Sequence, residues 1–289
     1  MRAAQARANV AKTAHLAAWV RTLGRLTAGQ ELANGDYLAE RFLLPHQRWL
    51  NRMPATTRWL MEHGAPGGFG YFNARTRYFD DVLLQVAAAG LEQLVLLGAG
   101  FDSRPLRFAQ QLRGVRVFEV DMPEVLQIRA ERLAGLSSEA APIAVPIDFA
   151  REDLGATLAA RGFVAAARTL FLWEGVTYYL PPAAVEAVLA SIAQKSEPGT
   201  SIVFDYVTQA FFEGDHSSYG AKSVADGWRR LGNVNLSGVR DVAALLAPHG
   251  FRVRSEVTPG ELEHRYLQAL PGGAVRAWGP FRIAHAERS

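Results

Sequence analysis

After Tyr71 the chain alternates short apolar segments with helical stretches, and this alternation constrains the fold more than any other feature. The apolar segments are nearly continuous, which is typical of strands that are buried on both faces of a mostly parallel sheet. We expect strands at 94–97, 115–120, 143–147, 169–172, 201–204, 251–257 and 281–284. We expect helices at 74–89, 183–193 and 239–246. The pattern therefore predicts an α/β protein that binds its ligand at the carboxyl ends of the strands.

The N-terminal part has a different character. Its first 65 residues show helical spacing of apolar side chains, as at Leu16, Val20 and Leu23, and no strand pattern. The segment 64–70 contains four glycines and a proline, which predicts a break and a hinge. Because α/β folds of this length often remain one unit, we expect 1–289 to be a single domain, with a helical cap at 1–70 and an α/β core at 71–289.

Composition excludes several classes of site and partner. The 31 basic and 28 acidic residues give a net charge of only +3. The sequence has no clustered basic stripe with interleaved aromatic residues, which is the pattern that nucleic-acid binding would favour. The chain has no cysteine, so disulfides, thiolate metal sites and cysteine nucleophiles are excluded, and we expect no metal site. No apolar run approaches the length of a membrane span. We therefore expect a cytoplasmic protein with neither nucleic acid nor a membrane as partner.

A glycine turn, Gly98-Ala99-Gly100, follows the first expected strand, and Asp121 ends the second. Glycines let the backbone turn tightly and approach a ligand closely. An acid about twenty residues further on, at the end of the next strand, can accept hydrogen bonds from two ribose hydroxyls. Alternatively, Asp121 caps a helix that starts near Pro123. The pair favours a nucleotide site.

The residues after the turn favour one kind of nucleotide. The dinucleotide-binding pattern has a third glycine, but Ser103 occupies that position here. The negative charge of Asp102 would also repel a pyrophosphate. A cofactor with cationic groups, such as S-adenosylmethionine (SAM), suits Asp102 better than NAD does. Asp148 could accept from an adenine amino group while Phe149 covers the ring, although a helix cap beside a core phenylalanine is the alternative.

Seven motifs occur in an order that resembles the leucine carboxyl methyltransferase family, whose bacterial branch comprises SAM-dependent O-methyltransferases, including polyketide carboxyl O-methyltransferases. The resemblance covers nearly the whole chain, from about Thr13 to Ala286. The motifs are 36–43 (DYLAERFL), 74–77 (ARTR), 98–104 (GAGFDSR), 118–121 (FEVD), 173–180 (WEGVTYYL), 203–206 (VFDY) and 263–267 (EHRYL). The resemblance implies a class I SAM-dependent methyltransferase fold, which is Rossmann-like with a mostly parallel seven-stranded sheet and an N-terminal helical cap.

The resemblance also implies roles for individual residues. Arg75 is expected to hold the SAM carboxylate, Glu174 to lie near its amino group, and Asp121 to take the ribose. Asp148 and Phe149 are expected to contact adenine. From the residues alone, a surface arginine paired with a nearby acid is the alternative for Arg75. The candidate cofactor-binding residues are Arg75, Gly98, Ala99, Gly100, Asp102, Arg104, Glu119, Asp121, Asp148, Phe149 and Glu174.

The methyl acceptor is expected to be a carboxylate of a small metabolite or peptide terminus. A carboxylate, with a pKa of about 4, is already ionised at neutral pH and needs no base. A phenol or other hydroxyl, the alternative acceptor, would want a base such as histidine. Arg229 or Arg230 could orient the acceptor, and Tyr178 or Tyr179 could shape its pocket. Two other classes stay open from the residues alone, namely an NAD-dependent oxidoreductase and a non-catalytic SAM-binding protein.

Overall fold

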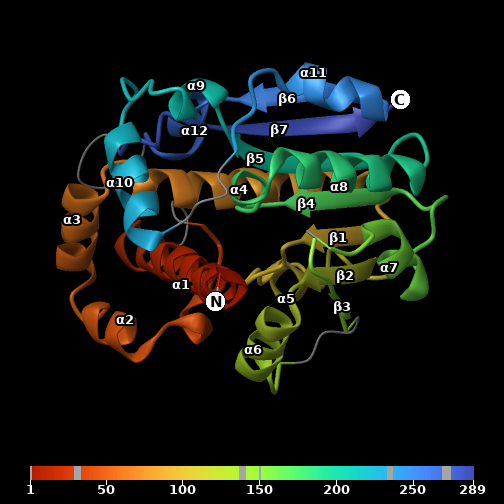
Figure 1. Cartoon of the computed structure of the whole chain (residues 1–289). Coiled ribbons are helices and arrows are strands. Elements are labelled where there is room, and N and C mark those ends of the chain that lie inside the picture. Colours follow the sequence, from red (N-terminus) through yellow and green to blue (C-terminus); the bar gives the residue numbers. More distant parts are fainter. Residues whose placement is uncertain (1, 29–33, 137–140, 150, 233–236, 269–274) are drawn as a thin grey trace.

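The computed structural model describes residues 2–28, 34–136, 141–149, 151–232, 237–268 and 275–289, and its centre is a seven-stranded sheet (Figure 1). The strand order is β3-β2-β1-β4-β5-β7-β6. Strands β1 to β5 pair in parallel, whereas β7 runs antiparallel to both β5 and β6. The strands are β1 (Gln93–Leu97), β2 (Arg116–Asp121), β3 (Ile143–Pro146), β4 (Thr169–Trp173), β5 (Ser201–Val207), β6 (Phe251–Val257) and β7 (Phe281–Arg288). The expected seven-stranded, mostly parallel sheet is confirmed.

Helices cover both faces of this sheet because successive side chains of each strand point to opposite faces. Leu94 and Leu96 of β1 pack into a core with α4 (Gly68–Ala88) and α12 (Pro259–Tyr266). Val95 and Leu97 pack into a second core on the other face. The helices of that second core are α7 (Leu154–Ala160), α8 (Pro182–Gln194) and α11 (Val242–Leu246). The other helices that follow α4 in the described residues are α5 (Arg104–Arg107), α6 (Pro123–Leu133), η2 (Thr177–Tyr179), α9 (Gln209–Phe212), α10 (Ala221–Leu231) and η3 (Ala247–His249).

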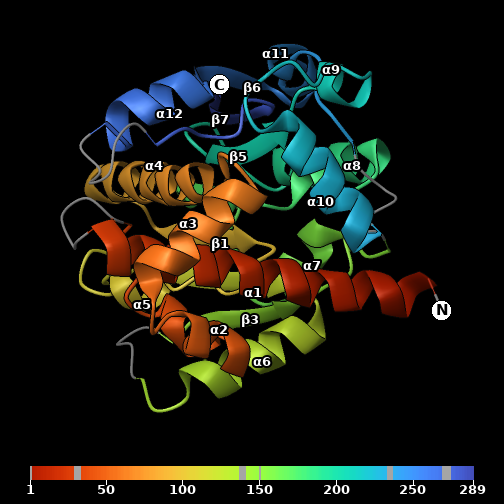
Figure 2. The same ribbon diagram turned by 90° about the vertical axis from the view of Figure 1, so that its left-hand side faces the viewer.

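The N-terminal region is helical, and its helices lie together on one side of the molecule (Figure 2). They are α1 (Arg2–Ala28), η1 (Ala39–Phe42), α2 (Pro45–Leu50) and α3 (Pro54–Gly64). Helix α1 packs against α4 and η1. The short 3-10 turn η1 is followed by α2, which begins at Pro45, a residue that suits the first position of a helix.

The expected break at 64–70 is wrong in its second half. Residues 65–67 lie outside the helices, with Gly67 as a left-handed N-cap at φ of +90°, and α4 starts at Gly68. A Cβ at Gly70 would lie 2.2 Å from the carbonyl oxygen of Arg276, and one at Gly68 would lie 2.8 Å from the Trp278 ring. These glycines are therefore needed for the close approach of a neighbouring segment, and packing overrides their weak helix propensity.

Two elements extend beyond their expected bounds because of pairing across the sheet. Strands β5 and β7 pair over seven residues, from Ser201 with Glu287 to Val207 with Phe281.

The helix expected at 239–246 is shorter than predicted. It starts only at Val242, where Asp241 caps it by accepting from the Ala244 amide at 3.0 Å. In the part of the chain that the structure describes, no helix is long and apolar enough to cross a membrane.

Candidate cofactor site

The turn after β1 has a backbone shape that only glycine adopts easily. Gly98 has φ of +68° and Gly100 has φ of +47°, both in the left-handed region. A Cβ on Gly98 would lie 2.4 Å from Cγ2 of Val176, in the loop after β4. Ala99 between them is buried. Packing against Val176 thus requires glycine at position 98, whereas a Cβ on Gly100 would meet only the Gly98 carbonyl oxygen, at 3.7 Å, which leaves space there for a ligand.

We expect Gly98→Ala to lower the free energy of unfolding by about 1–2 kcal/mol through left-handed backbone strain, with a further loss from the clash with Val176. Affinity for SAM should fall as the turn moves. Gly98→Ala should cost less stability in a Val176→Ala background than in the wild type, because the smaller side chain relieves the clash but not the strain. An equal cost in both backgrounds, measured by thermal melting of all four proteins, would show that the clash with Val176 is not a cause.

Asp121, at the end of β2, faces the glycine turn. Its Oδ2 accepts from the Gly100 amide at 2.6 Å and its Oδ1 accepts from the Met122 amide at 2.7 Å. Burial raises the pKa of Asp121 to about 6, although these two amides act to lower it. The N-cap of α6 is Met122, so Asp121 is not the surface cap of the alternative interpretation. It is a buried carboxylate whose charge is poorly solvated without a ligand.

Arg75, from α4, lies at the centre of a buried cluster of charges. Its Nε donates to Oε1 of Glu174 at 2.9 Å and its Nη1 donates to Oδ2 of Asp205 at 2.7 Å. Its side chain is only 4% exposed, so Arg75 is not a surface arginine. A Cβ on Gly175 would lie 3.4 and 3.5 Å from its two terminal nitrogens. The missing side chain at Gly175 therefore leaves room above the guanidinium group.

Glu174 bridges two arginines. Its Oε2 lies 2.7 Å from Nη1 of Arg104, while Oε1 binds Arg75. Burial alone would raise the pKa of Glu174, but Arg104 and Arg75 outweigh it and bring the pKa to about 2. Arg104 also pairs with Asp80 at 2.6 Å and with Asp102 at 2.5 Å. Glu174 therefore stays ionised, and Arg104 offsets the charge of Asp102.

Asp205, at the end of β5, received no role from the sequence although it belongs to this cluster. It is fully buried and accepts from the Tyr71 hydroxyl at 2.8 Å and the Gly175 amide at 2.6 Å. Two signals in the sequence mark it, namely its position just after the strand expected at 201–204 and its place in the motif 203–206. The structure thus adds a carboxylate that orients both Arg75 and the loop after β4.

Other candidate residues lie at the same edge of the sheet with other partners. Both Glu119 oxygens accept from Arg129, which is on α6, at 2.8 and 2.5 Å. Asp148 is partly exposed and lies 3.6 Å from Arg151, and Phe149 is half-buried against the second core. The Ile147 amide donates to the Asp121 carbonyl at 2.9 Å. Asp148 and Phe149 follow Ile147 directly and therefore lie near Asp121.

An aromatic cluster adjoins Arg75. Tyr178 lies 3.4 Å from Nη1 of Arg75, and its ring is 4.7 Å from that of Tyr179 and 5.6 Å from that of Trp228. Burial raises the pKa of Tyr178 well above its usual range and that of Tyr179 to about 12. Both phenols therefore stay protonated at neutral pH and can donate hydrogen bonds.

The structure does not bring Arg229 and Arg230 to this cluster. Arg229 is exposed and pairs with Asp226 at 3.0 Å, and Arg230 donates to the Asp226 carbonyl. The buried side of the same helix, α10, presents Trp228 instead.

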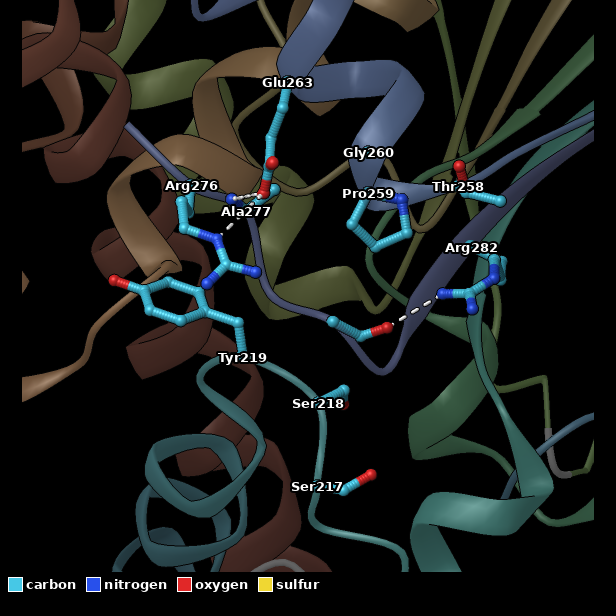
Figure 3. A pocket seen from close by; sticks show the side chains of 11 residues that line it. Ser217, Ser218, Tyr219, Thr258, Pro259, Gly260, Glu263, Arg276, Ala277 and Arg282 are labelled. Atoms are coloured by element: carbon cyan, nitrogen blue, oxygen red, sulfur yellow. Dashed lines mark hydrogen bonds and ion pairs between the residues drawn. The ribbon is translucent and has the colours of Figure 1, made fainter. Parts of the chain in front are cut away.

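A separate cavity of about 540 Å³ opens near the start of α12 (Figure 3). Arg276 stacks over the Tyr219 ring at 4.1 Å on one wall, and Arg282 donates to the Gly279 carbonyl on the other. Its lining comes from 217–219, 258–263 and 276–282, so it does not coincide with the candidate cofactor residues.

Comparison with known proteins agrees with this geometry. Residues 14–193 match the leucine carboxyl methyltransferase family. A provisionally named SAM-dependent methyltransferase of Mycolicibacterium smegmatis is 35% identical over 214 residues, which cover 70% of this chain and 69% of that protein. A Mycobacterium tuberculosis protein with the same provisional activity is 38% identical over 58% of this chain and 53% of its own length.

The fold also has a counterpart among solved structures. A DUF574 family protein from Streptomyces avermitilis superposes with a TM-score of 0.60 at 12% identity, covering 93% of this chain and 97% of that one. At that identity the likeness concerns the fold alone. The expected use of SAM instead of NAD is confirmed by the family match and the relatives. The chain belongs to the leucine carboxyl methyltransferase family and is a SAM-dependent methyltransferase.

Proposed function

We propose that this enzyme transfers the methyl group of SAM to an oxygen atom, and that the oxygen belongs to a carboxylate of a small metabolite or peptide terminus. The observation that carries the proposal is a pair of protonated phenols, the buried Tyr178 beside Arg75 and the partly buried Tyr179 next to it. Such phenols can donate hydrogen bonds to an oxyanion but cannot act as bases at neutral pH. The matched family, described by carboxyl methylation, supports the same acceptor.

The cofactor fits the charges around the turn. Asp121 would accept from the ribose hydroxyls, which would add two donors to the Gly100 and Met122 amides around its buried carboxylate. Glu174, held ionised by Arg75 and Arg104, would accept from the amino group. The cofactor carboxylate would approach Arg75 over Gly175. The backbone of Gly98 and Gly100 would line the methionine part, and Asp148 and Phe149 the adenine.

Methyl transfer then requires little from the protein beyond placing the acceptor oxygen in line with the methyl group of the cofactor. Bound SAM supplies a methyl group on a cationic sulfur. An ionised acceptor oxygen can bond to the methyl carbon as the carbon–sulfur bond breaks, and the sulfur leaves as a neutral thioether. Proximity, in-line alignment and exclusion of water can carry the rate of such a step. The aromatic cluster of Tyr178, Tyr179 and Trp228 would exclude water from the acceptor and define its shape.

One observation supports a second acceptor class. The ring of His216 lies 4.9 Å from that of Phe211, which packs edge-on against Trp228 at 5.7 Å. His216 therefore stands at the rim of the aromatic cluster, where it could take the proton of a phenol.

The test is labelled methyl transfer from SAM into panels of carboxylic acids and phenols. A methyl ester releases methanol in mild alkali, whereas a methyl ether does not. We expect ester products, and we expect His216→Ala to keep full activity. Ether products that are absent with the His216→Ala variant would show that the acceptor is a phenol and not a carboxylate.

A further inference from the structure

Two polar residues of the N-terminal cap reach the turn that follows the glycines. Arg21, from α1, donates from Nη2 to the Phe101 carbonyl at 2.9 Å and from Nε to Oδ2 of Asp36 at 2.7 Å. The other oxygen of Asp36 accepts from the Ser103 hydroxyl at 2.5 Å. Arg21 and Asp36 are 7% and 2% exposed. The cap therefore holds the turn by a backbone atom and by a side chain.

Apolar contacts fix the residue between these two attachment points. The Phe101 ring stacks on that of Phe42 in η1, with centroids 4.5 Å apart and planes 9° apart. His15 of α1 lies 4.8 Å from the same ring on a tilted plane. Phe101 is 3% exposed. The residue after the glycine turn is thus held between α1 and η1.

We propose that Arg21 and Asp36 are positioning residues for the cofactor, which hold the Phe101–Ser103 segment and thereby fix the adjoining glycine turn, whose Gly100 amide donates to Asp121. The proposal rests on the SAM site assigned above to the glycine turn. Two glycines at positive φ make that turn intrinsically soft, because glycine has more accessible backbone conformations than any other residue. Holding it in one shape beforehand lowers the entropy lost on binding.

The charges explain why both members of the pair are needed. Asp36 lies between Arg21 and Arg107, which approaches it at 3.8 Å. Burial would raise the pKa of Asp36, but the two arginines and the Ser103 hydroxyl hold it below its usual value. Arg107 also donates to Ser103 at 2.8 Å. An ionised Asp36 can therefore keep Arg21 and Ser103 in place together.

The test compares SAM affinity in three variants by calorimetry. Asp36→Asn and Ser103→Ala should each raise the dissociation constant about tenfold, which is the effect of losing one hydrogen bond to a charged group. Ser103→Ala removes only a hydroxyl and guards against the case in which Asp36→Asn fails to fold. Arg25→Gln is the matched control: Arg25, which is partly buried, joins α1 to the exposed Glu40 of η1 at 2.9 Å, and this pair makes none of the contacts that hold Phe101 and Ser103. Its affinity should be unchanged.

A second measurement separates positioning from a general loss of structure. The Gly100 amide acts to lower the pKa of Asp121, so a displaced turn should move the midpoint of the pH dependence of SAM binding upward. We expect this upward shift in Ser103→Ala and not in Arg25→Gln. Wild-type affinity and midpoint in both Ser103→Ala and a folded Asp36→Asn would overturn the positioning role. Failure of the wild-type protein to bind SAM would instead overturn the cofactor site on which it rests.

Discussion

Replacing Arg75 with alanine is expected to lower the free energy of unfolding by about 3–5 kcal/mol and to weaken SAM binding at least about a hundredfold. The stability loss follows because Asp205, fully buried, would lose its charged partner and keep only the Tyr71 hydroxyl and the Gly175 amide. The affinity loss follows because the cofactor carboxylate would lose its proposed partner. Denaturant unfolding and calorimetry measure the two effects separately.

The double variant Arg75→Ala with Asp205→Asn separates the two roles. Removing the buried charge of Asp205 should restore much of the stability, because an uncharged amide costs less to bury than an unpaired carboxylate. SAM affinity should stay low. If affinity returned together with stability, Arg75 would act only through the fold, and an Arg75→Ala protein with unchanged affinity would remove it from the site altogether.

The second large effect concerns Asp121 and pH. Above the pKa of about 6 the carboxylate is ionised and can accept from two ribose hydroxyls, and below that pKa it is protonated. Because binding favours the ionised form, SAM affinity should rise with pH up to about 6 and fall by about tenfold per unit below it. Binding near this pKa should also release a proton, which calorimetry in two buffers of different ionisation enthalpy counts.

Asp121→Asn should bind SAM about a hundredfold more weakly at neutral pH, since one of its two acceptor atoms becomes a donor. Its affinity should also lose the pH dependence around pH 6. Asp153→Asn is the control, because Asp153 is an exposed helix cap that accepts from the Ala156 amide. A pH dependence that persisted in Asp121→Asn would assign the titration to another group.

The sequence predicted those features that depend on neighbours along the chain. The strands, the glycine turn and the acid at the end of β2 are local patterns, and the structure has all of them. Parallel strands also bring their carboxyl ends to one edge, so the closeness of Gly100 and Asp121 followed from the fold class alone.

The predictions that failed or fell short concern contacts between distant elements. Arg75 and Asp205 are 130 positions apart, and nothing in the local sequence shows that β5 ends beneath α4. Arg229 lies away from the aromatic cluster for a different reason. Val224 and Trp228, four residues apart, mark the buried side of α10, so the residue after Trp228 turns away from the core.

The attachment of the cap to the cofactor turn also bears on how the chain folds. Arg21 contacts Phe101 across 80 positions, and Asp36 contacts Ser103 across 67. Contacts of such long range close large loops, which costs chain entropy and slows folding. During synthesis, the N-terminal helix can dock here only once β1 and its turn have been made. A cofactor that binds at this turn, as proposed above, is expected to bind the docked chain best, so its binding would report on that docking.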